Sequence, residues 1–583
     1  MQKLAVRLGT EPVRPLLERM NPGNWVIDTA AFPGGEIGVI HAPGDQSSPL
    51  ASAGSGPGLW RLENGDIIAW SGLPLPGREP VRRVPASELP DLAPSLDGVF
   101  AVVGWSQAEG RLYIATDFLG LQPLYVGETA EGWIAATETK VFPYVPDPAG
   151  WGAFLGLGYP IGRGSLTANA ERPRPASLLT VTPAPPEAPQ RTARVETRRY
   201  WQIPEEGREP PPAEAVAALK TNAAAYQALV GRSVCLLSGG FDSRLILSLL
   251  HRLGVKDRRA FILSHHDQDA DMDGRLAAAV ARRSGTPIQY YKQDREFYST
   301  SAYLDYVWAI DGATANLHLF IAQLASTLNG HGAIWEGLIP ALALSTLQQP
   351  GDGTFDAFHR ERYKPNRIAI QIFKPQVRQS FLDAFEEEFA RTRTLYPNTP
   401  HGMWQWVVEN RTRNRAGVNP TKVYVNYATP LMVGSSRDLW ELTSPLPFAR
   451  RRDHSYYVDV FRALAPEFAQ VPFYSSGGTL YRADTNPLTY MAHVLGLKGW
   501  RAIANRPLLA RLCGINRKFG FIPSRFTRHP AIFEEEDDLL DMDFVRRAQT
   551  DEALRQEAGK LLFHWRAVRW MHENRLHQTL LSA

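Results

Sequence analysis

The sequence predicts a protein in two parts, a layered β-sheet domain followed by an α/β domain whose C-terminal portion is helical. Over the first 200 residues, short apolar segments recur between Gly, Pro, Asn and Asp turns, a spacing typical of packed antiparallel sheets. From residue 213 onward, apolar segments of strand length alternate with helical segments, which indicates βαβ units and a parallel sheet. Beyond residue 373 the pattern becomes helical. We therefore expect one domain over residues 1–205 and a second over residues 206–583.

The composition is that of a folded protein with no nucleic-acid or membrane partner. The chain has 583 residues, of which 44% are hydrophobic, and its net charge is only +3 from 63 basic and 60 acidic side chains. Such a balance gives no basic surface for nucleic acid. The N-terminal residues lack the apolar run of a signal peptide, and the two cysteines, Cys235 and Cys513, cannot build a disulfide framework. We expect a soluble, cytoplasmic protein.

Six apolar segments carry the strand prediction in the first domain. They span residues 25–27, 37–40, 66–70, 99–103, 112–115 and 133–136. A Pro-rich stretch over residues 182–189 follows, with the composition of a linker or an edge segment. A second Pro-rich stretch, residues 209–212, precedes an Ala-rich helix that leads into the next domain.

The second domain is organised around one strand, turn and helix. An apolar strand over residues 234–237 enters the turn Ser238-Gly239-Gly240, and an apolar-rich helix follows. The glycines allow a close approach to a bound group, and the unpaired amides of the helix start attract anions. Asp242 and Ser243 add a carboxylate and a hydroxyl suited to metal and phosphate chemistry. We predict a phosphate site here, with an ordinary Gly-rich turn as the alternative.

The next strands place the base of a nucleotide. Residues 259–264 and 287–291 are expected to be parallel strands separated by a helix over 273–283. Ligands of such sheets bind at the carboxyl ends of strands. We therefore expect adenine beside residues from two neighbouring strands, namely Leu237, Ile262 and Leu263. A metal site at residues 265–267 is disfavoured, because adjacent histidines point apart on a strand.

Ser238-Gly239-Gly240-Phe241-Asp242-Ser243 resembles the pyrophosphate loop of the ATP pyrophosphatases. In that family ATP is cleaved between its α- and β-phosphates and an acyl group is adenylated. The resemblance implies that pyrophosphate is bound by Ser238, Gly239, Gly240 and Ser243, and that Asp242 organises magnesium.

Three stretches of the first domain, taken in order, resemble the glutaminase domain of class II amidotransferases, which has an Ntn-hydrolase-like fold. They are residues 98–102, 117–125 and 136–140. That family uses the thiol of an N-terminal cysteine, whereas Met1 is followed here by Gln2. Without a nucleophile no thioester forms. We expect a retained scaffold or binding surface that releases no ammonia; a generic β-sandwich is the alternative.

Residues 333–337 resemble the strand and "S-G-E-G-x-D-E" turn of the synthetases. Glu336 and Gly337 are retained, and we assign them to the metal and nucleotide sites. The aspartate position falls on Ile339, which cannot ligate a hard cation. Three consequences of this loss are open. Glu336 takes the place of the missing aspartate as a magnesium ligand, magnesium is held by Asp242 and the phosphates alone, or turnover is impaired.

Residues 515–523 resemble the family's "R-x-K-x-G-F-x-x-P" loop. The resemblance implies that Lys518 reaches the α-phosphate and acts as a catalytic residue together with Asp242; a basic surface turn is the alternative. Asp273 matches an acidic position of the family as well as it matches an ordinary packing face. Asp305 and Asp311 lie in the region where the family has an acidic residue, and both are candidates for the general base.

The order of these motifs resembles the asparagine synthetase B-type family, with a HUP-like ATP pyrophosphatase domain. Loss of the glutaminase nucleophile makes the chain similar to β-lactam synthetases and lasso-peptide cyclases. That resemblance implies an ATP- and Mg²⁺-dependent ligase that closes a macrolactam, with a precursor peptide, a leader peptidase and a leader-binding protein as partners. Two alternatives are an ammonia-dependent asparagine synthetase and a non-catalytic scaffold.

Overall fold

The computed structural model describes residues 2–43, 58–75, 81, 83–184, 193–230, 232–264, 272–292, 296–315, 321, 324, 333–346, 353–474, 480–504, 506–512 and 525–581.

The N-terminal part consists of two stacked antiparallel sheets. The first has the order β2-β3-β1-β9-β8 and the second the order β11-β10-β7-β6-β5-β4. Their strands are β1 (Gln2–Leu8), β2 (Val26–Phe32), β3 (Gly35–His41), β4 (Leu59–Arg61), β5 (Ile67–Leu75), β6 (Asp97–Ser106), β7 (Arg111–Thr116), β8 (Tyr125–Thr129), β9 (Gly132–Ala136), β10 (Ser177–Pro183) and β11 (Ala193–Arg199). The predicted layered sheets are confirmed.

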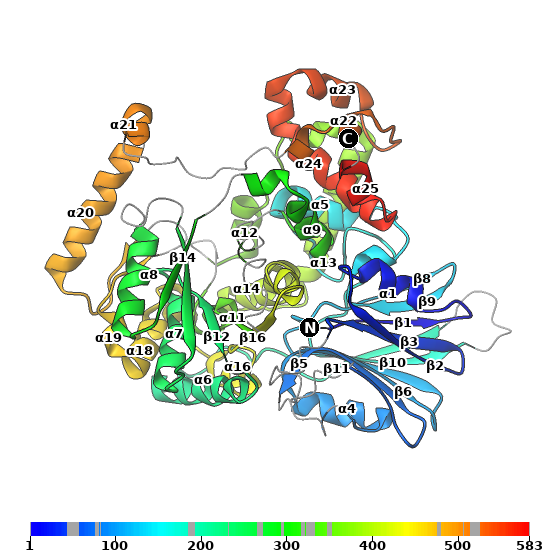
Figure 1. The fold of residues 1–583 in the computed structure, drawn as a ribbon, viewed down its shortest axis with the longest axis horizontal. Coiled ribbons are helices and arrows are strands. Elements are labelled where there is room, and N and C mark those ends of the chain that lie inside the picture. Colours follow the sequence, from blue (N-terminus) through cyan, green and yellow to red (C-terminus); the bar gives the residue numbers. More distant parts are fainter. Residues whose placement is uncertain are drawn as a thin grey trace.

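Alternation along the strands builds the core between the two sheets. Leu4, Val6 and Leu8 of β1 share one buried cluster with Val103 and Ile114 of the facing sheet. The outer faces are covered by helices, α1 (Arg14–Met20) over the first sheet and α4 (Leu89–Leu92) over the second (Figure 1). The result is a four-layer domain with a helix on each side.

The Pro-rich stretch lies inside this domain. It falls between β10 and β11, which pair antiparallel from Ser177 opposite Arg199 to Pro183 opposite Ala193. It therefore connects two strands of one sheet.

The second part is built on a five-stranded sheet of order β14-β13-β12-β15-β16, in which every pair is parallel. Its strands are β12 (Ser233–Leu236), β13 (Arg258–Ser264), β14 (Ile288–Lys292), β15 (Ala333–Glu336) and β16 (Thr429–Met432). The chain adds β13 and β14 on one side of β12 and then β15 and β16 on the other. The strand order thus reverses between β12 and β15, the place where such sheets bind ligands at their carboxyl ends.

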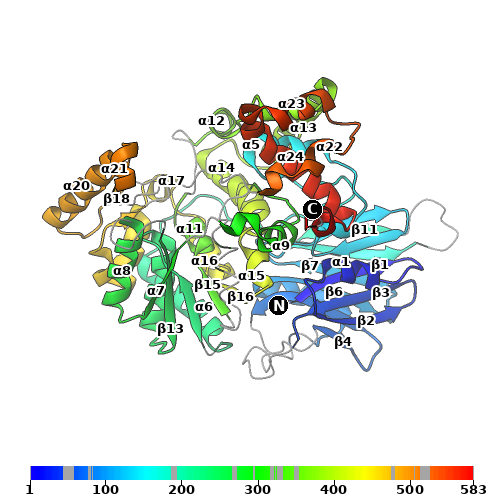
Figure 2. The same cartoon turned by 45° about the horizontal axis from the view of Figure 1, so that its top comes forward.

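Helices surround this sheet and make up most of the C-terminal half (Figures 1 and 2). They are α5 (Pro148–Leu157), α6 (Pro212–Gln227), α7 (Phe241–Arg252), α8 (Met272–Arg283), α9 (Ser301–Ala309), α11 (Leu338–Leu344), α12 (Phe355–Arg362), α13 (Pro375–Arg393), α14 (Pro400–Val407), α15 (Thr421–Val425), α16 (Arg437–Thr443), α17 (Phe448–Arg452), α18 (Ser455–Leu464), α19 (Pro466–Ala469), α20 (Pro487–Ala504), α21 (Pro507–Leu512), α22 (Pro530–Glu534), α23 (Met542–Thr550), α24 (Glu552–His572) and α25 (Leu576–Leu581). A short hairpin, β17 (Phe473–Tyr474) and β18 (Leu480–Tyr481), precedes α20. Within the described residues, no helix is both long and apolar enough to cross a bilayer.

The two parts are joined by buried polar contacts. The Glu409 carboxylate pairs with Arg174 at 3.0 Å and with Arg199 at 2.8 Å. The buried Arg172 guanidinium donates to the Arg413 carbonyl at 2.9 Å. Because these groups are out of water, separating the parts would strand charges that are now paired.

Candidate functional site

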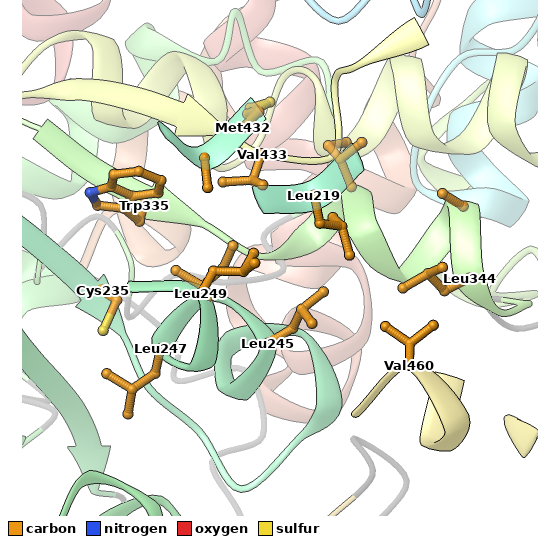
Figure 3. Close-up of a cluster of buried hydrophobic side chains, with 14 of the residues drawn as sticks. Leu219, Cys235, Leu245, Leu247, Leu249, Trp335, Leu344, Met432, Val433 and Val460 are labelled. Atoms are coloured by element: carbon orange, nitrogen blue, oxygen red, sulfur yellow. The ribbon is translucent and has the colours of Figure 1, made fainter. Parts of the chain in front are cut away.

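The predicted loop lies at the carboxyl end of β12, and residues 237–240 connect that strand to α7. Figure 3 shows why this unit is fixed: side chains of α7, such as Leu245 and Leu249, gather with Trp335 of β15 and Leu344 of α11 in one apolar cluster. Packing of this kind holds the loop at the point where the strand order reverses.

Three successive loop amides point at side-chain oxygens. The Ser238 amide donates to the Ser243 hydroxyl at 2.9 Å, and the Gly239 amide donates to Asp273 Oδ1 at 2.8 Å. The Gly240 amide donates to the Ser238 hydroxyl at 3.2 Å, and the two hydroxyls are 2.9 Å apart. The predicted phosphate-binding residues are therefore brought together. In this structure their amides donate hydrogen bonds to side-chain oxygens of Ser243, Asp273 and Ser238.

The helix that follows adds an anion-attracting end. α7 begins after Gly240, and none of the described side chains caps it there. The first amides of a helix without a cap, with the positive end of the helix dipole behind them, attract negative charge. The loop and the helix start therefore suit a phosphate chain.

Gly337 acts through close packing. A Cβ atom on Gly337 would lie 2.8 Å from the Asp242 carbonyl carbon and 3.0 Å from the Ser243 amide nitrogen. Only glycine lets the end of β15 approach the first turn of α7 so closely. Gly337 thus supports the loop.

Two carboxylates lie at the edge of the sheet, Asp242 in the first turn of α7 and Glu336 at the end of β15. Burial raises the pKa of the Asp242 carboxyl to about 7; a hydrogen bond from the Tyr457 hydroxyl at 3.1 Å opposes the rise, and the nearby charge of Glu336 adds to it. Glu336 itself is 8% exposed and also adds to a rise in the pKa of the buried Tyr424 hydroxyl. A divalent cation would relieve the repulsion between the two carboxylates.

This donor set fits Mg²⁺. Among the described residues, no three His, Cys, Asp or Glu side chains gather to form an all-protein metal cage. Magnesium is usually held by one or two carboxylates, with water and substrate phosphates completing its shell. Asp242 and Glu336 suit that pattern. Ile339, at the position of the expected aspartate, is 1% exposed and belongs to the apolar core.

Arg244 fastens the loop to a distant segment. Its buried guanidinium donates to the Gly239 carbonyl at 2.8 Å and to the Val471 carbonyl at 2.7 Å. The Tyr474 amide of β17 donates to the same Gly239 carbonyl at 2.8 Å. Sequence analysis gave Arg244 no role, because its partners other than Gly239 lie more than 220 residues away and are backbone carbonyls without a sequence signal.

The three residues expected beside adenine differ in exposure. Leu237 is 3% exposed, and its amide donates to the Phe261 carbonyl at 2.8 Å. Ile262 is fully buried in the same core, whereas Leu263 is partly exposed. Lys518, Cys513 and residues 265–267 lie outside the described residues.

The two candidate bases occupy other surroundings. Asp305 is exposed, with its Oδ1 atom 2.8 Å from His577 Nε2. Asp311 is buried, 2.7 Å from the Lys140 ammonium and 2.5 Å from the Lys422 ammonium, which lower its pKa against the effect of burial. Both carboxylates are therefore engaged in ion pairs.

Asp311 belongs to a buried charge cluster that links the two parts of the chain. Glu138 contacts Lys140 and lies 3.0 Å from the Lys3 ammonium. Among the described residues, the cluster combines Lys3, Lys140 and Lys422 with Glu138 and Asp311, so the lysines exceed the carboxylates by one. The 136–140 motif of the sequence supplies Glu138 and Lys140 to this cluster.

The 117–125 motif is also a framework element. Asp117 Oδ1 accepts the Leu121 amide at 3.0 Å, and Asp117 Oδ2 accepts the Gln122 amide at 2.9 Å. The buried carboxylate thereby closes the turn after β7 on itself, so this motif specifies local structure.

Two family models match the chain. Residues 79–143 match the glutamine amidotransferase domain, and residues 227–332 match asparagine synthase. No curated protein sequence is similar enough to count as a match. The asparagine synthase match implies that the protein uses ATP.

Solved structures also align with the chain at low similarity. One is described as the allosteric regulatory enzyme of purine biosynthesis; it is 12% identical over 50% of this chain and 80% of its own, with a TM-score of 0.23. Another is the glutamine phosphoribosylpyrophosphate amidotransferase from B. subtilis complexed with ADP and GMP. It is 11% identical over 67% of this chain and 93% of its own, with a TM-score of 0.23.

An amidotransferase domain thus precedes an asparagine synthase domain whose loop lies at the reversal point of a parallel sheet. The two matches, in this order, support an asparagine synthetase B-type enzyme and indicate a ligase that forms carbon–nitrogen bonds.

Proposed function

We propose that the protein activates a carboxylate with ATP and passes the acyl group to an amine of a peptide, closing a macrolactam. The observation that carries this proposal is the loop after β12, where the amides of Ser238, Gly239 and Gly240 converge with the start of α7. They do so beside the carboxylates of Asp242 and Glu336. This arrangement suits a pyrophosphate leaving group rather than a transferred γ-phosphate.

The reaction has two balanced steps. A carboxylate oxygen of the substrate forms a bond to the α-phosphorus, and the bond from that phosphorus to the β-phosphate oxygen breaks as pyrophosphate leaves. The amine nitrogen then bonds to the acyl carbon, AMP leaves, and the nitrogen gives up a proton. Fixed amides and a cation aimed at the developing charge lower the barrier of such a step by several kcal/mol, of the order of 3.

The chain's own residues divide this work. The Ser238 and Ser243 hydroxyls and the first amides of α7 would bind the leaving pyrophosphate. The loop amides would join them by exchanging their present side-chain acceptors for phosphate oxygens. Asp242 and Glu336 would hold Mg²⁺, whose charge neutralises the phosphate oxygens. Lys518 would approach the α-phosphate; this role follows from the sequence motif alone.

A peptide amine is the more economical nitrogen source. The first 200 residues contain no cysteine, and Cys235 is buried in β12 with its thiol pKa raised to about 12 by burial. A thiol in that state is a poor nucleophile. The proposed partners are a precursor peptide, a leader peptidase and a leader-binding protein.

The same family match supports a second candidate, an asparagine synthetase that uses ammonia. Mass spectrometry separates the two. A peptide substrate carrying a free N-terminal amine and an internal Asp or Glu should lose one water in the presence of Mg·ATP. Conversion of free aspartate and ammonia to asparagine, with an unchanged peptide, would favour the synthetase.

The loop itself is tested by a matched pair of serines in α7. Ser243→Ala removes the acceptor of the Ser238 amide and should lower pyrophosphate release roughly 100-fold. Ser248→Ala is the control, because Ser248 is buried in the same helix and donates to the Arg244 carbonyl at 2.8 Å. Equal activity of the two variants would contradict the assignment of the loop.

A further inference from the structure

α20 turns an apolar face to solvent. Leu488, Met491 and Leu495 are 82%, 54% and 61% exposed, and their spacing places them on one side of the helix. α21 adds Leu508 and Leu512, which are 77% and 82% exposed. We call these five side chains the arm face. Exposed apolar groups that gather in this way mark interaction sites.

The opposite side of α20 is packed. Leu497 is 6% exposed and belongs to the core cluster, and Val494 packs against that cluster. A Cβ atom on Gly496 would lie 3.8 Å from the Met272 side chain of α8. The helix is thus attached through its inner side, and the arm face is left over from that packing.

Two series of contacts connect α20 and α21, which we call the arm, to the loop of residues 237–240. The Tyr490 hydroxyl donates to the Leu480 carbonyl of β18 at 3.1 Å, β18 pairs with β17, and the Tyr474 amide of β17 donates to Gly239. The second route passes through α8, whose Asp273 accepts the Gly239 amide. Figures 1 and 2 both show α20 beside α8 at the edge of the molecule. A partner on the arm face would therefore lie next to α8 and the β17–β18 hairpin, the two elements that contact the loop.

The arm also carries a one-sided charge. The exposed side chains of residues 487–512 include Lys498, Arg501 and Arg506, and the sequence of this segment contains no Asp or Glu. A surface that combines leucines with positive charges only is complementary to a segment that combines apolar and acidic side chains.

We propose that the arm face binds an acidic, amphipathic segment of the peptide whose carboxylate is activated at the loop. The inference rests on the proposed function and deepens it by naming where the substrate docks. A free amino acid is too small to need such a surface, since the 18 residues of α20 extend about 27 Å. A second copy of the chain would bring like charges together, and a lipid surface would have no need of the connection to the loop.

The test is binding of a fluorescein-labelled helical peptide as long as α20, with leucines along one side and glutamates along the other. Binding is followed by fluorescence anisotropy without ATP. The protein variant L488S/M491S/L495S should bind at least roughly ten-fold more weakly than wild type. Leu395→Ser is the matched control, because Leu395 is a 47%-exposed leucine outside the arm, and it should leave the affinity unchanged.

Several results would overturn the docking proposal. These are equal binding of a peptide with lysines in place of the glutamates, unchanged affinity of the triple variant, recruitment to phosphatidylglycerol vesicles without peptide binding, and a wild-type dimer that the triple variant breaks. Mg·ATP binding, measured separately by calorimetry, should be the same in wild type and triple variant. Failure of wild type to bind Mg·ATP would instead overturn the proposed function, so the two failures are distinguishable.

Discussion

At the scale of single residues, charge burial is the dominant feature of this protein. Asp242, Glu336 and the cluster around Asp311 all keep carboxylates out of water. At the loop, burial raises the pKa of Asp242, and the nearby charge of Glu336 adds to the rise and prepares a place for a cation. In the cluster, three lysines pair with two carboxylates, which leaves one lysine in excess.

Because the cluster has one lysine in excess, we expect its lysines to contribute unequally to the free energy of unfolding. Lys3→Met should leave two lysines against two carboxylates and cost less than about 1 kcal/mol in the free energy of unfolding. Lys140→Met removes the one lysine that contacts both carboxylates, which leaves Glu138 with Lys3 and Asp311 with Lys422, and should cost roughly 3–5 kcal/mol. Urea unfolding at pH 7 measures both. Because both variants leave two lysines against two carboxylates, similar costs would show that the bridging position of Lys140 does not organise the cluster.

The pH dependence of Lys3 provides a second readout. Burial lowers the pKa of the Lys3 ammonium to about 8, from 10.5 in the unfolded chain. Between pH 8 and 10.5 the unfolded state therefore binds more protons, so this group makes the protein more stable as pH rises. The difference in stability between wild type and Lys3→Met should shift toward wild type in that window. A difference that does not change with pH would contradict the lowered pKa.

Lys518 carries the residue-scale prediction for chemistry. Lys518→Ala should leave Mg·ATP affinity within a few-fold of wild type and lower the rate of AMP formation by roughly 100-fold or more, because its charge acts as the adenylate forms. Calorimetry and a pyrophosphate assay separate the two effects. Equal losses in affinity and rate would indicate a binding role only.

At the scale of elements, the end of β15 packs directly against the first turn of α7. Gly337, at the end of β15, lies so close to the first turn of α7 that a methyl group has no room. The loop between β12 and α7 therefore depends on two strands, one of which follows it by about a hundred residues.

Gly337→Ala should consequently displace the first turn of α7. We expect loss of measurable Mg·ATP binding and a decrease of roughly 1–3 kcal/mol in the free energy of unfolding. Gly499→Ala is the control, because a Cβ atom there meets nothing within 4 Å. It should raise helix stability by roughly 0.5–1 kcal/mol and leave ATP binding unchanged. Normal ATP binding by Gly337→Ala would mean that the loop tolerates the shift.

Much of this arrangement is predictable from sequence. The motif of residues 238–243 and the alternation of apolar segments give the parallel sheet and the loop, since both are local signals. The contacts of Tyr457 and Arg244 are not predictable, because they depend on segments more than 200 residues apart and on backbone carbonyls. The pattern likewise gave no sign that Asp311 would be paired with lysines from both parts of the chain.

At the scale of the whole molecule, the two parts form one folded unit. Glu409 is paired with Arg174 and Arg199, Asp311 is paired with Lys140, and the Gly98 amide donates to the Ser435 carbonyl at 3.0 Å. The N-terminal sheets therefore stabilise the half that holds the loop.

A fragment of residues 206–583 expressed alone should fail to fold, because it would expose Glu409, Asp311 and the apolar surface of the missing part. Circular dichroism and size-exclusion chromatography measure this. Co-expression of residues 1–205 should restore a soluble complex. A soluble fragment with a cooperative thermal transition would show that the junction is dispensable.

Arg244 donates to four backbone carbonyls, those of Gly239, Phe468, Val471 and Pro472, and this has a consequence for protein engineering. One guanidinium joins the loop to Val471, 227 residues later in the chain. A chimera that transplants residues 234–252 into another parallel sheet would carry Arg244 and the Gly239 carbonyl but lose the other three carbonyl acceptors, those of Phe468, Val471 and Pro472. The chimera therefore needs residues 468–474 as well. A mutant library that varies residues 234–252 has to vary residues 468–474 together with them.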